Sequence, residues 1–245
     1  MYPFIRIFGR SFSTYALMAL LGAILCVVYC FVISLRKKLS FKYNVFFLIT
    51  GVPLGFIGAV LMYYVSRIDE VSLVLPYLFS DPHYFFASVS YGFVYYGGLL
   101  GFLCGLAIGT QISDADNRKT LFYMFPCIPL FHAVGRIGCF FSGCCYGING
   151  FPIQLVESGI NIIIFIILCC ILNRDKKYFL TSAVYFLTYG TVRFILEYFR
   201  GDSIRGKLWI FSTSQWISLL IIIPLGIYNL CVRTEKNHFN KWFKS

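Results

Sequence analysis

Charged residues are scarce in this chain, and their scarcity excludes an ordinary water-soluble domain. They make up 13% of the 245 residues, whereas soluble domains contain roughly 25%. Hydrophobic residues make up 59% of the chain, and the mean hydropathy is +0.77. The composition therefore predicts a protein embedded in a lipid bilayer.

Other absences bear on the architecture. No low-complexity linker and no convincing internal repeat divides the sequence, so we expect a single domain over residues 1–245. No small-x-small cleavage site follows the first apolar stretch, which is also too long for a signal-peptide core, so this stretch is expected to be retained. No metal-binding or nucleotide-binding motif is present, and we therefore expect no cofactor and no metal.

The ten cysteines do not form the pattern of a disulfide framework. Cys139, Cys144 and Cys145 lie close together in the sequence, at a spacing that matches no standard zinc pattern. The others fall within apolar stretches, where cysteine behaves as a small apolar residue; they are Cys26, Cys30, Cys104, Cys127, Cys169, Cys170 and Cys231.

Seven apolar stretches are long enough to cross a bilayer, which takes about 20 helical residues. We therefore predict an all-α, polytopic membrane protein. The fourth stretch is interrupted by Pro126, Pro129, His132 and Arg136. A broken helix is tolerated in a membrane only where it lines a cavity or is buried in protein. The predicted spans are residues 13–35, 43–65, 91–112, 121–141, 152–172, 179–199 and 212–232.

The positive charges favour an orientation with the N-terminus outside and the C-terminus inside. The formal net charge of +11 could indicate a nucleic-acid partner, but its distribution along the chain indicates a membrane instead. In the N-out orientation, 13 of the 21 Lys and Arg residues fall in inner loops and the tail, and six fall in outer segments, as the positive-inside rule requires. The outer segment 66–90 is rich in aromatic residues, and we expect it to lie in the membrane interface as a short amphipathic helix.

Four ionisable residues inside the apolar stretches are the strongest indication of function: Arg136, Glu157, Arg193 and Glu197. A charge at mid-bilayer costs at least about 2.5–3.5 kcal/mol on insertion scales, so such residues pair with one another, line a wet cavity or bind a ligand. Here two cations and two anions occur in segments that are rich in glycine.

The sixth span carries Tyr189, Arg193, Glu197 and Arg200 at a spacing that predicts one stripe of a helix. One interpretation is an ion pair, four residues apart, that fixes helix packing. The other is an anion site, in which Glu197 orients the guanidinium of Arg193 for bidentate contact with a phosphate.

Arg136 and Glu157 each allow two interpretations. Arg136 is surrounded by glycines, including Gly138 and Gly147, that let helices approach closely or let backbone N–H groups face a ligand. The alternative for this segment is small-residue helix packing with one snorkelling arginine. Glu157 either caps the first turn of the fifth span or, with Gln154 on the same helix face, binds a glycerol hydroxyl.

The third span contains glycines at positions 97, 101, 105 and 109, and this four-residue period indicates a packing groove. Tyr96 precedes the groove and Tyr15 begins the first span, where tyrosine is also common as an interface anchor. In the predicted topology both tyrosines and the four charged residues map to the outer halves of their spans. A polar cavity near the outer leaflet suits a phospholipid headgroup.

Taken together, these motifs resemble the prolipoprotein diacylglyceryl transferase family. The resemblance rests on Gly135-Arg-Ile-Gly-Cys-Phe-Phe-Ser-Gly143, Pro152-Ile-Gln-Leu-Val-Glu157, Tyr189-Gly-Thr-Val-Arg-Phe-Ile-Leu-Glu-Tyr-Phe-Arg200, Tyr15-Ala-Leu-Met and Tyr96-Gly-Gly-Leu. It implies a seven-span enzyme of the bacterial plasma membrane with its active site toward the outer leaflet. That family transfers the diacylglyceryl group of phosphatidylglycerol to the lipobox cysteine thiol of a prolipoprotein and releases glycerol phosphate.

The resemblance also implies roles for individual residues. Arg136 and Arg193 would hold the phosphate and stabilise the departing glycerol phosphate, and Tyr96, Glu157 and Glu197 are the candidates for a base. The expected phosphatidylglycerol-binding residues are Arg136, Arg193, Tyr15, Gln154, Glu157, Gly138 and Gly147.

The chain departs from the family pattern at three positions. Tyr96 stands where the family usually has histidine, Cys139 where it has asparagine, and Cys144 where it has glutamate. Two other functions remain open at this point: a non-catalytic phospholipid-binding protein or transporter, and a membrane thiol oxidoreductase built on Cys139, Cys144 and Cys145.

Overall fold

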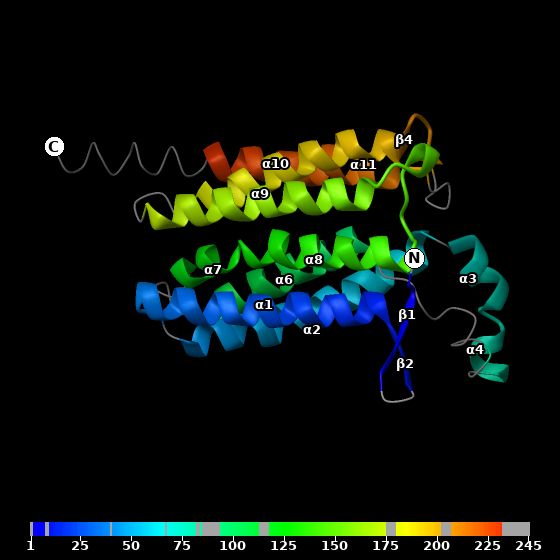
Figure 1. Ribbon diagram of the computed structural model, residues 1–245, viewed down its shortest axis with the longest axis horizontal. Helices are drawn as coiled ribbons and strands as arrows, with labels where there is room; N and C mark the ends of the chain where they lie inside the picture. Colours follow the sequence, from blue (N-terminus) through cyan, green and yellow to red (C-terminus); the bar gives the residue numbers. More distant parts are fainter. Residues whose placement is uncertain are drawn as a thin grey trace. The chain divides into compact units, whose positions relative to one another are not determined.

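The computed structural model describes residues 2–7, 10–39, 41–66, 68–81, 84, 94–112, 118–174, 180–201 and 207–231. The chain divides into two compact units. Unit 1 comprises Met1–Phe41 and Lys119–Ser245, and unit 2 comprises Lys42–Arg118. Helices dominate both units (Figure 1), as the composition predicts.

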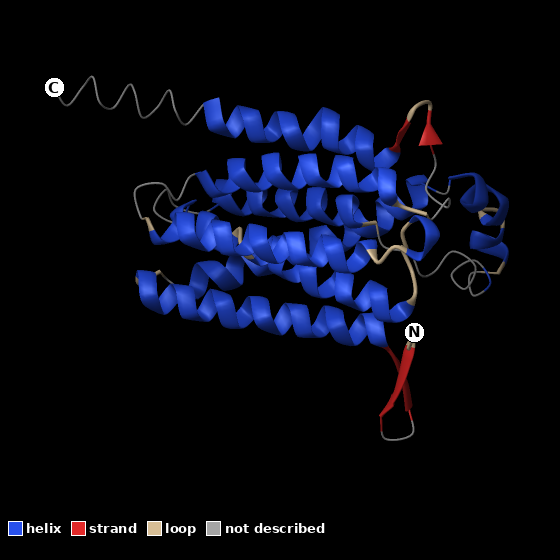
Figure 2. Cartoon of the chain, turned by 45° about the horizontal axis from the view of Figure 1, so that its top comes forward, coloured by secondary structure: helices blue, strands red, loops and turns tan. Residues whose placement is uncertain are grey.

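Unit 1 begins with a β-hairpin that leads directly into the first helix. Strands β1 (Phe4–Ile7) and β2 (Arg10–Ser13) pair antiparallel, with Ile7 opposite Arg10 at the turn. The hairpin extends from the N-terminal end of α1 (Thr14–Lys37) (Figure 2). The backbone N–H of Thr14 donates to the carbonyl of Pro3 over 2.9 Å, which closes the junction between hairpin and helix.

The fourth predicted span is a broken helix, as its prolines indicate. Helix α7 (Arg118–Met124) ends just before Pro126, and α8 (Cys127–Ser142) starts just after it. Proline lacks a backbone N–H and its ring clashes with the preceding turn, so the helix breaks at this residue. Pro129 is tolerated because it lies in the first turn of α8, where N–H groups have no intrahelical partner.

Helix α8 packs against both α1 and α9 (Ile153–Asn173) (Figure 1). Glycines allow the close approach to α1: a Cβ on Gly138 would lie 3.0 Å from Cβ of Met18 and 3.4 Å from Cα of Tyr15. Between α8 and α9, the hydroxyl of Ser158 donates to the carbonyl of Ala133 over 2.9 Å. These contacts fix the rotation of α8 and therefore decide which of its side chains face α9.

The C-terminal part of unit 1 contains two long helical stretches joined through a short 3-10 turn and a small β-sheet. Helix α10 (Leu180–Leu196) continues into the 3-10 turn η4 (Glu197–Phe199). Strands β3 (Lys207–Leu208) and β4 (Phe211–Ser212) form a two-stranded sheet. The last helical stretch starts as α11 (Thr213–Ile217), passes through the π-helical turn η5 (Ser218–Ile222) and continues to Cys231. A capping box between Ser212 and Gln215 starts α11.

Unit 2 is built on close packing of two helices, α2 (Phe41–Ser66) and α6 (Tyr95–Ile112). The predicted glycine groove is confirmed, because a Cβ on Gly101 or Gly105 would run into the backbone of α2, at Leu54 and Thr50 respectively. Gly97 likewise lies against the carbonyl of Gly58.

The described residues of the predicted interfacial segment 66–90 include two short helices, where we expected one. These are α3 (Ile68–Val74) and α4 (Tyr77–Ser80), and residues 67, 82, 83 and 85–90 of the segment lie outside the described residues. Leu73 and Phe79 are among its exposed apolar side chains.

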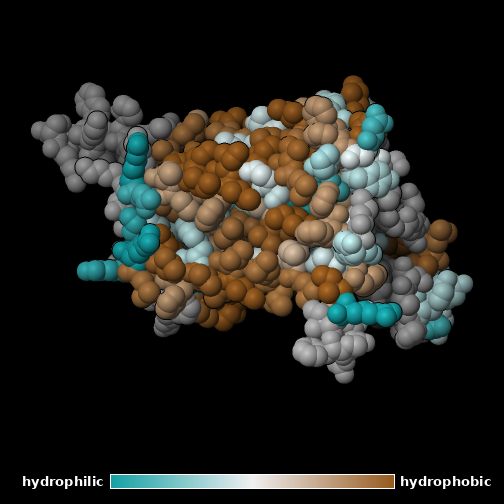
Figure 3. Space-filling view, viewed as in Figure 1, coloured by the Kyte–Doolittle hydropathy of each residue, from teal (hydrophilic) through white to brown (hydrophobic). Residues whose placement is uncertain are grey.

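Five helical segments among the described residues are long and apolar enough to cross a membrane, against the seven expected. They are Thr14–Lys37, Asn44–Val65, Thr120–Ser142, Ile153–Asn173 and Thr213–Cys231. The two remaining predicted spans correspond to the shorter apolar helix Tyr95–Gly109 and to α10, which has 17 residues. The exposed faces of α1 and α9 are apolar (Figure 3), which is the surface a lipid environment requires.

Candidate functional site

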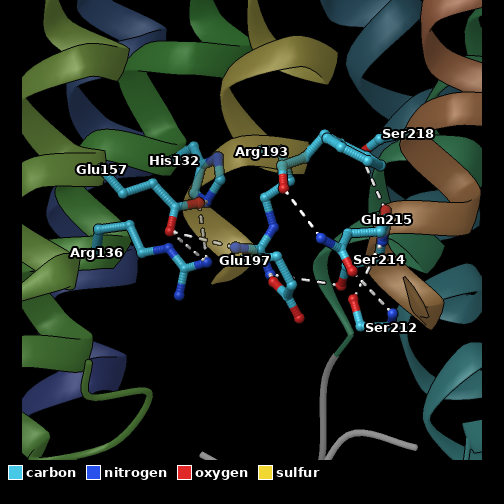
Figure 4. Close-up of polar contacts among 10 residues, drawn as sticks. His132, Arg136, Glu157, Arg193, Glu197, Ser212, Ser214, Gln215 and Ser218 are labelled. Atoms are coloured by element: carbon cyan, nitrogen blue, oxygen red, sulfur yellow. Dashed lines mark hydrogen bonds and ion pairs between the residues drawn. The ribbon is translucent and has the colours of Figure 1, made fainter. Parts of the chain in front are cut away.

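Glu157 lies at the centre of a buried polar cluster formed by α8, α9 and α10 (Figure 4). Nη2 of Arg136 lies 2.9 Å from each of its carboxylate oxygens. Nε2 of His132 lies 3.4 Å from Oε1, and Nη1 of Arg193 lies 3.7 Å from Oε2. Three nitrogen-bearing side chains from two helices thus surround one carboxylate that is only 1% exposed.

Arg193 connects Glu157 to a second carboxylate and to the start of the last helix. Its Nη2 lies 2.7 Å from Oε2 of Glu197 and donates to Oγ of Ser214 over 3.4 Å. The guanidinium is 2% exposed. The four charged residues singled out in the sequence therefore form one continuous chain, Arg136–Glu157–Arg193–Glu197, and the structure brings all four together.

Helical spacing explains why α8 and the end of α10 each supply two members of this cluster. His132 and Arg136 are four residues apart on α8 and both face Glu157. Arg193 and Glu197 are also four residues apart, at the junction of α10 and η4. The amide of Asn161 donates to the carbonyl of Glu157 over 2.8 Å, which adds a side-chain contact one turn further along α9.

Two of the alternative interpretations are wrong. Arg136 does not snorkel, because it is 6% exposed and its guanidinium is held by a buried carboxylate. Glu157 does not cap a helix, because it is the fifth residue of α9 and the first turn contains no acidic residue. The ion pair between Arg193 and Glu197 is real, and it is one part of the larger cluster.

The predicted stripe on the sixth span holds for Tyr189, Arg193 and Glu197, but the helix ends before Arg200. Helix α10 ends at Leu196, and Arg200 has extended backbone (φ −81°, ψ 136°). Arg200 instead forms a β-bridge with Gly147. The cause is the change from α-helix to 3-10 turn at Glu197, which alters the angular spacing of the residues that follow.

Both guanidinium groups retain hydrogen-bond donors that the cluster does not use. Among the described residues, neither Nε of Arg136 nor Nη1 of Arg193 has a hydrogen-bond acceptor. Buried polar groups are normally satisfied, so an unsatisfied donor in a polar cluster calls for an explanation such as a bound anion or water. Two such donors on two arginines, both held in place by Glu157, are suited to an oxyanion with several acceptor oxygens.

Gln154 and Gly147 hold the loop that joins α8 to α9. Nε2 of Gln154 donates to the carbonyl of Cys144 over 2.8 Å. The N–H of Gly147 donates to the carbonyl of Phe151 over 3.0 Å. A Cβ at position 147 would lie 3.0 Å from the carbonyl oxygen of Phe199, so glycine allows this loop to approach the chain that follows α10.

The other predicted binding residues differ in how closely they are tied to the cluster. Tyr15 is 38% exposed near the start of α1, beside Gly138 of α8. Tyr96 is the second residue of α6 and belongs to unit 2, so its predicted role remains a prediction.

Sequence reasoning missed two members of the cluster. His132 appeared only as an interruption of an apolar span, although its position four residues before Arg136 was a usable signal. Ser214 gave no signal, since its approach to Arg193 depends on how α11 packs beside α10.

Comparison with known proteins identifies what this chain resembles. The family model described as prolipoprotein diacylglyceryl transferase matches residues 3–231. The phosphatidylglycerol–prolipoprotein diacylglyceryl transferase of Clostridium tetani is 27% identical over 246 residues, covering 92% of this chain and 95% of the relative. The corresponding enzyme of Chlorobaculum tepidum is 31% identical over 190 residues, covering 69% and 65%. Transferase 2 of Clostridium perfringens is 27% identical, with 92% and 93% covered.

Proposed function

Because the chain belongs to the prolipoprotein diacylglyceryl transferase family, we propose that it transfers the diacylglyceryl group of phosphatidylglycerol to the lipobox cysteine thiol of a prolipoprotein. This is the first step of lipoprotein maturation, and it releases glycerol phosphate. The lipid-binding and oxidoreductase alternatives have no comparable support, since the relatives are named as transferases.

The observation that carries the proposal is the pair of arginines held by one buried carboxylate. Arg136 and Arg193 both contact Glu157, and each keeps a donor without an acceptor among the described residues. A phosphate that accepts from Nε of Arg136 and Nη1 of Arg193 satisfies both donors. Glu157 orients the guanidinium groups in advance, so little reorganisation is needed when the lipid binds.

The chemistry requires a nucleophile and a leaving group but no cofactor. The sulfur of the substrate cysteine attacks the glycerol carbon that bears the phosphate, a C–S bond forms, and the C–O bond to the phosphate breaks with its electron pair staying on oxygen. The phosphodiester has one negative charge and the departing glycerol phosphate gains a second. Arginines that bind the phosphate therefore interact more strongly with the transition state than with the bound lipid, which is the condition for catalysis.

The thiol proton needs an acceptor. A free thiol has a pKa near about 8.5, so modest assistance suffices. Tyr96, Glu157 and Glu197 are the acceptors that the sequence suggests. His132 joins them, because Nε2 of its imidazole lies within the same buried cluster, 3.4 Å from Oε1 of Glu157. Glu197 is the second carboxylate in contact with Arg193.

The remaining binding roles extend the site along the lipid headgroup. Gln154 and Gly147 hold the loop beside the cluster, and Tyr15 and Gly138 line the contact between α1 and α8. In the proposal these residues contact the glycerol and ester region, while the acyl chains stay in the bilayer.

The membrane arrangement completes the proposal. The chain is a multi-pass protein of the bacterial plasma membrane with seven spans, N-out and C-in, which act as one transferase domain over residues 1–245. Segment 66–90 lies in the outer interface, and the site opens toward the outer leaflet, where the acceptor cysteine emerges. Cysteine-labelling or reporter fusions test this: a C-terminus on the outer side of the membrane contradicts the proposed mechanism.

Transfer itself is tested with purified protein in proteoliposomes that contain phosphatidylglycerol and a lipobox peptide. We expect lipidated peptide and glycerol phosphate in equal amounts. A matched peptide with serine in place of the lipobox cysteine should remain unmodified. Lipid binding without turnover by correctly folded protein would instead favour a non-catalytic lipid-binding protein.

A further inference from the structure

The C-terminal turn of α8 brings together thiols that lie five residues apart in the sequence. The helix ends in a Schellman motif: the N–H of Gly143 donates to the carbonyl of Phe140, and the N–H of Cys144 donates to the carbonyl of Cys139, each over 3.2 Å. Gly143 has φ 74°, the left-handed conformation that this motif uses. The motif folds Cys144 back over Cys139, at the pair of positions whose side chains usually make contact in this motif.

Cys145 completes the group because its backbone also turns. It has φ 59°, which is uncommon for a residue with a side chain. The three Sγ atoms of Cys139, Cys144 and Cys145 all lie within 4.8 Å of one another. None of the three forms a disulfide, and the loop is held in place by the hydrogen bond from Gln154 to the carbonyl of Cys144.

This geometry fits a single metal ion with little adjustment. Zinc–sulfur bonds are about 2.3 Å long, so three sulfurs around one ion lie about 4 Å from one another. Small side-chain rotations bring sulfurs at most 4.8 Å apart to that spacing. Thiolate ligands select Zn²⁺, Cu⁺ and related thiophilic ions rather than Mg²⁺ or Ca²⁺.

The exposure of the three thiols differs in a way that suits an accessible binding site. Cys139 is buried, Cys145 is half-buried and Cys144 is exposed. Cys144 therefore offers a route of entry, and Cys139 fixes the inner side of the site. His132 does not belong to this group, and its Nε2 faces Glu157. The set of three sulfurs leaves a fourth position open, as in zinc sites that keep a water, or supports three-coordinate Cu⁺.

We propose that Cys139, Cys144 and Cys145 form a binding site for one thiophilic metal ion with a filled d shell, such as Zn²⁺ or Cu⁺, at the C-terminal end of α8. The proposal rests on the backbone turn and the sulfur positions alone. It does not depend on the transferase activity, so either can fail without the other.

The first experiment measures binding directly, with Cd²⁺ as the probe. Reduced full-length protein in detergent is titrated with Cd²⁺, and bound metal is counted by elemental analysis and by the ultraviolet thiolate-to-cadmium absorption. We expect one tightly bound ion per chain. The triple variant C139S/C144S/C145S should lose it, whereas the matched control C104S/C170S/C231S, which removes three exposed cysteines elsewhere, should keep it. Equal binding by both variants overturns the proposal.

The second experiment needs no variant, so a folding defect cannot obscure it. The unmodified protein is treated with a maleimide with and without Cd²⁺, and the labelled cysteines are identified by peptide mass spectrometry. Bound Cd²⁺ should slow labelling of Cys144 at least tenfold, and should leave labelling of the exposed Cys170 and Cys231 unchanged. Labelling of Cys144 that is insensitive to Cd²⁺ contradicts the proposal.

Discussion

Replacing Arg193 with lysine is the most discriminating test of the proposed phosphate site. The guanidinium uses two separate nitrogens: Nη2 lies 2.7 Å from Glu197, and Nη1 lies 3.7 Å from Glu157 and has an unused donor. Lysine keeps the positive charge but has a single nitrogen on a flexible stem. It can retain the contact with Glu197 or reach the phosphate, but it cannot do both in the same geometry.

The expected loss follows from that geometry. A hydrogen bond to a charged group is worth about 1.5–3 kcal/mol, and about 1.4 kcal/mol corresponds to a tenfold change in rate. We therefore expect R193K to lower kcat/KM about ten- to 150-fold, with folding intact. Initial rates of peptide lipidation at several phosphatidylglycerol concentrations in proteoliposomes measure this. R136K should behave in the same way.

A double variant separates catalysis from packing. R193Q alone removes the arginine that pairs with Glu197, whose side chain is only 7% exposed. Breaking a buried ion pair by removing one partner costs about 3–5 kcal/mol of stability. R193Q/E197Q removes both charges and should regain much of that stability, as measured by thermal unfolding in detergent, yet remain inactive. Near-normal transfer by the double variant would show that this ion pair serves only helix packing, and would refute the assignment of Arg193 to the phosphate.

Three further predictions follow from particular contacts. E157Q should destabilise the protein by about 3–5 kcal/mol in denaturant titration, because it leaves two buried guanidinium groups without their shared carboxylate; unchanged stability would contradict a central role for Glu157. S214A should lower kcat/KM less than tenfold, because its hydrogen bond to Arg193 is long, at 3.4 Å, and therefore weak. S214A should have no further effect in R193K if Ser214 acts by positioning that guanidinium. G101A should lower the melting temperature in detergent far more than G98A. The new Cβ runs into the backbone of Leu54 in the first case, whereas in the second its nearest neighbour is Cβ of Ala59, at an ordinary contact distance of 3.4 Å. Similar melting temperatures would argue against the glycine groove.

The parts of the fold that the sequence predicted are those governed by local rules. The break before α8 follows from Pro126, and the packing of α6 follows from glycines at a four-residue period. The membrane character follows from composition, and five of the expected spans are long enough to cross a membrane.

The parts that could not be predicted depend on how the helices rotate against one another. The sequence identified Arg136 and Glu157 as buried charges but could not indicate that they pair, since 21 residues separate them. The end of α10 at Leu196 was also missed, and with it the extended backbone at Arg200. No proline or glycine marks that end before Gly201, so local signals favoured a longer helix.

The broken helix also has a consequence for the order of events during biosynthesis. The most apolar 18-residue stretch of the span Thr120–Ser142 has a mean hydropathy of 1.4, the lowest among the five candidate spans. Within that stretch, 61% is buried inside the protein. Its Arg136 leaves the ribosome before Glu157, the carboxylate that neutralises it in the folded protein. Until α9 has been synthesised, Arg136 lacks this carboxylate partner, and an unpaired arginine is costly in the bilayer. This span should therefore commit to the membrane only after α9 has been made, with α1 already in place to receive it.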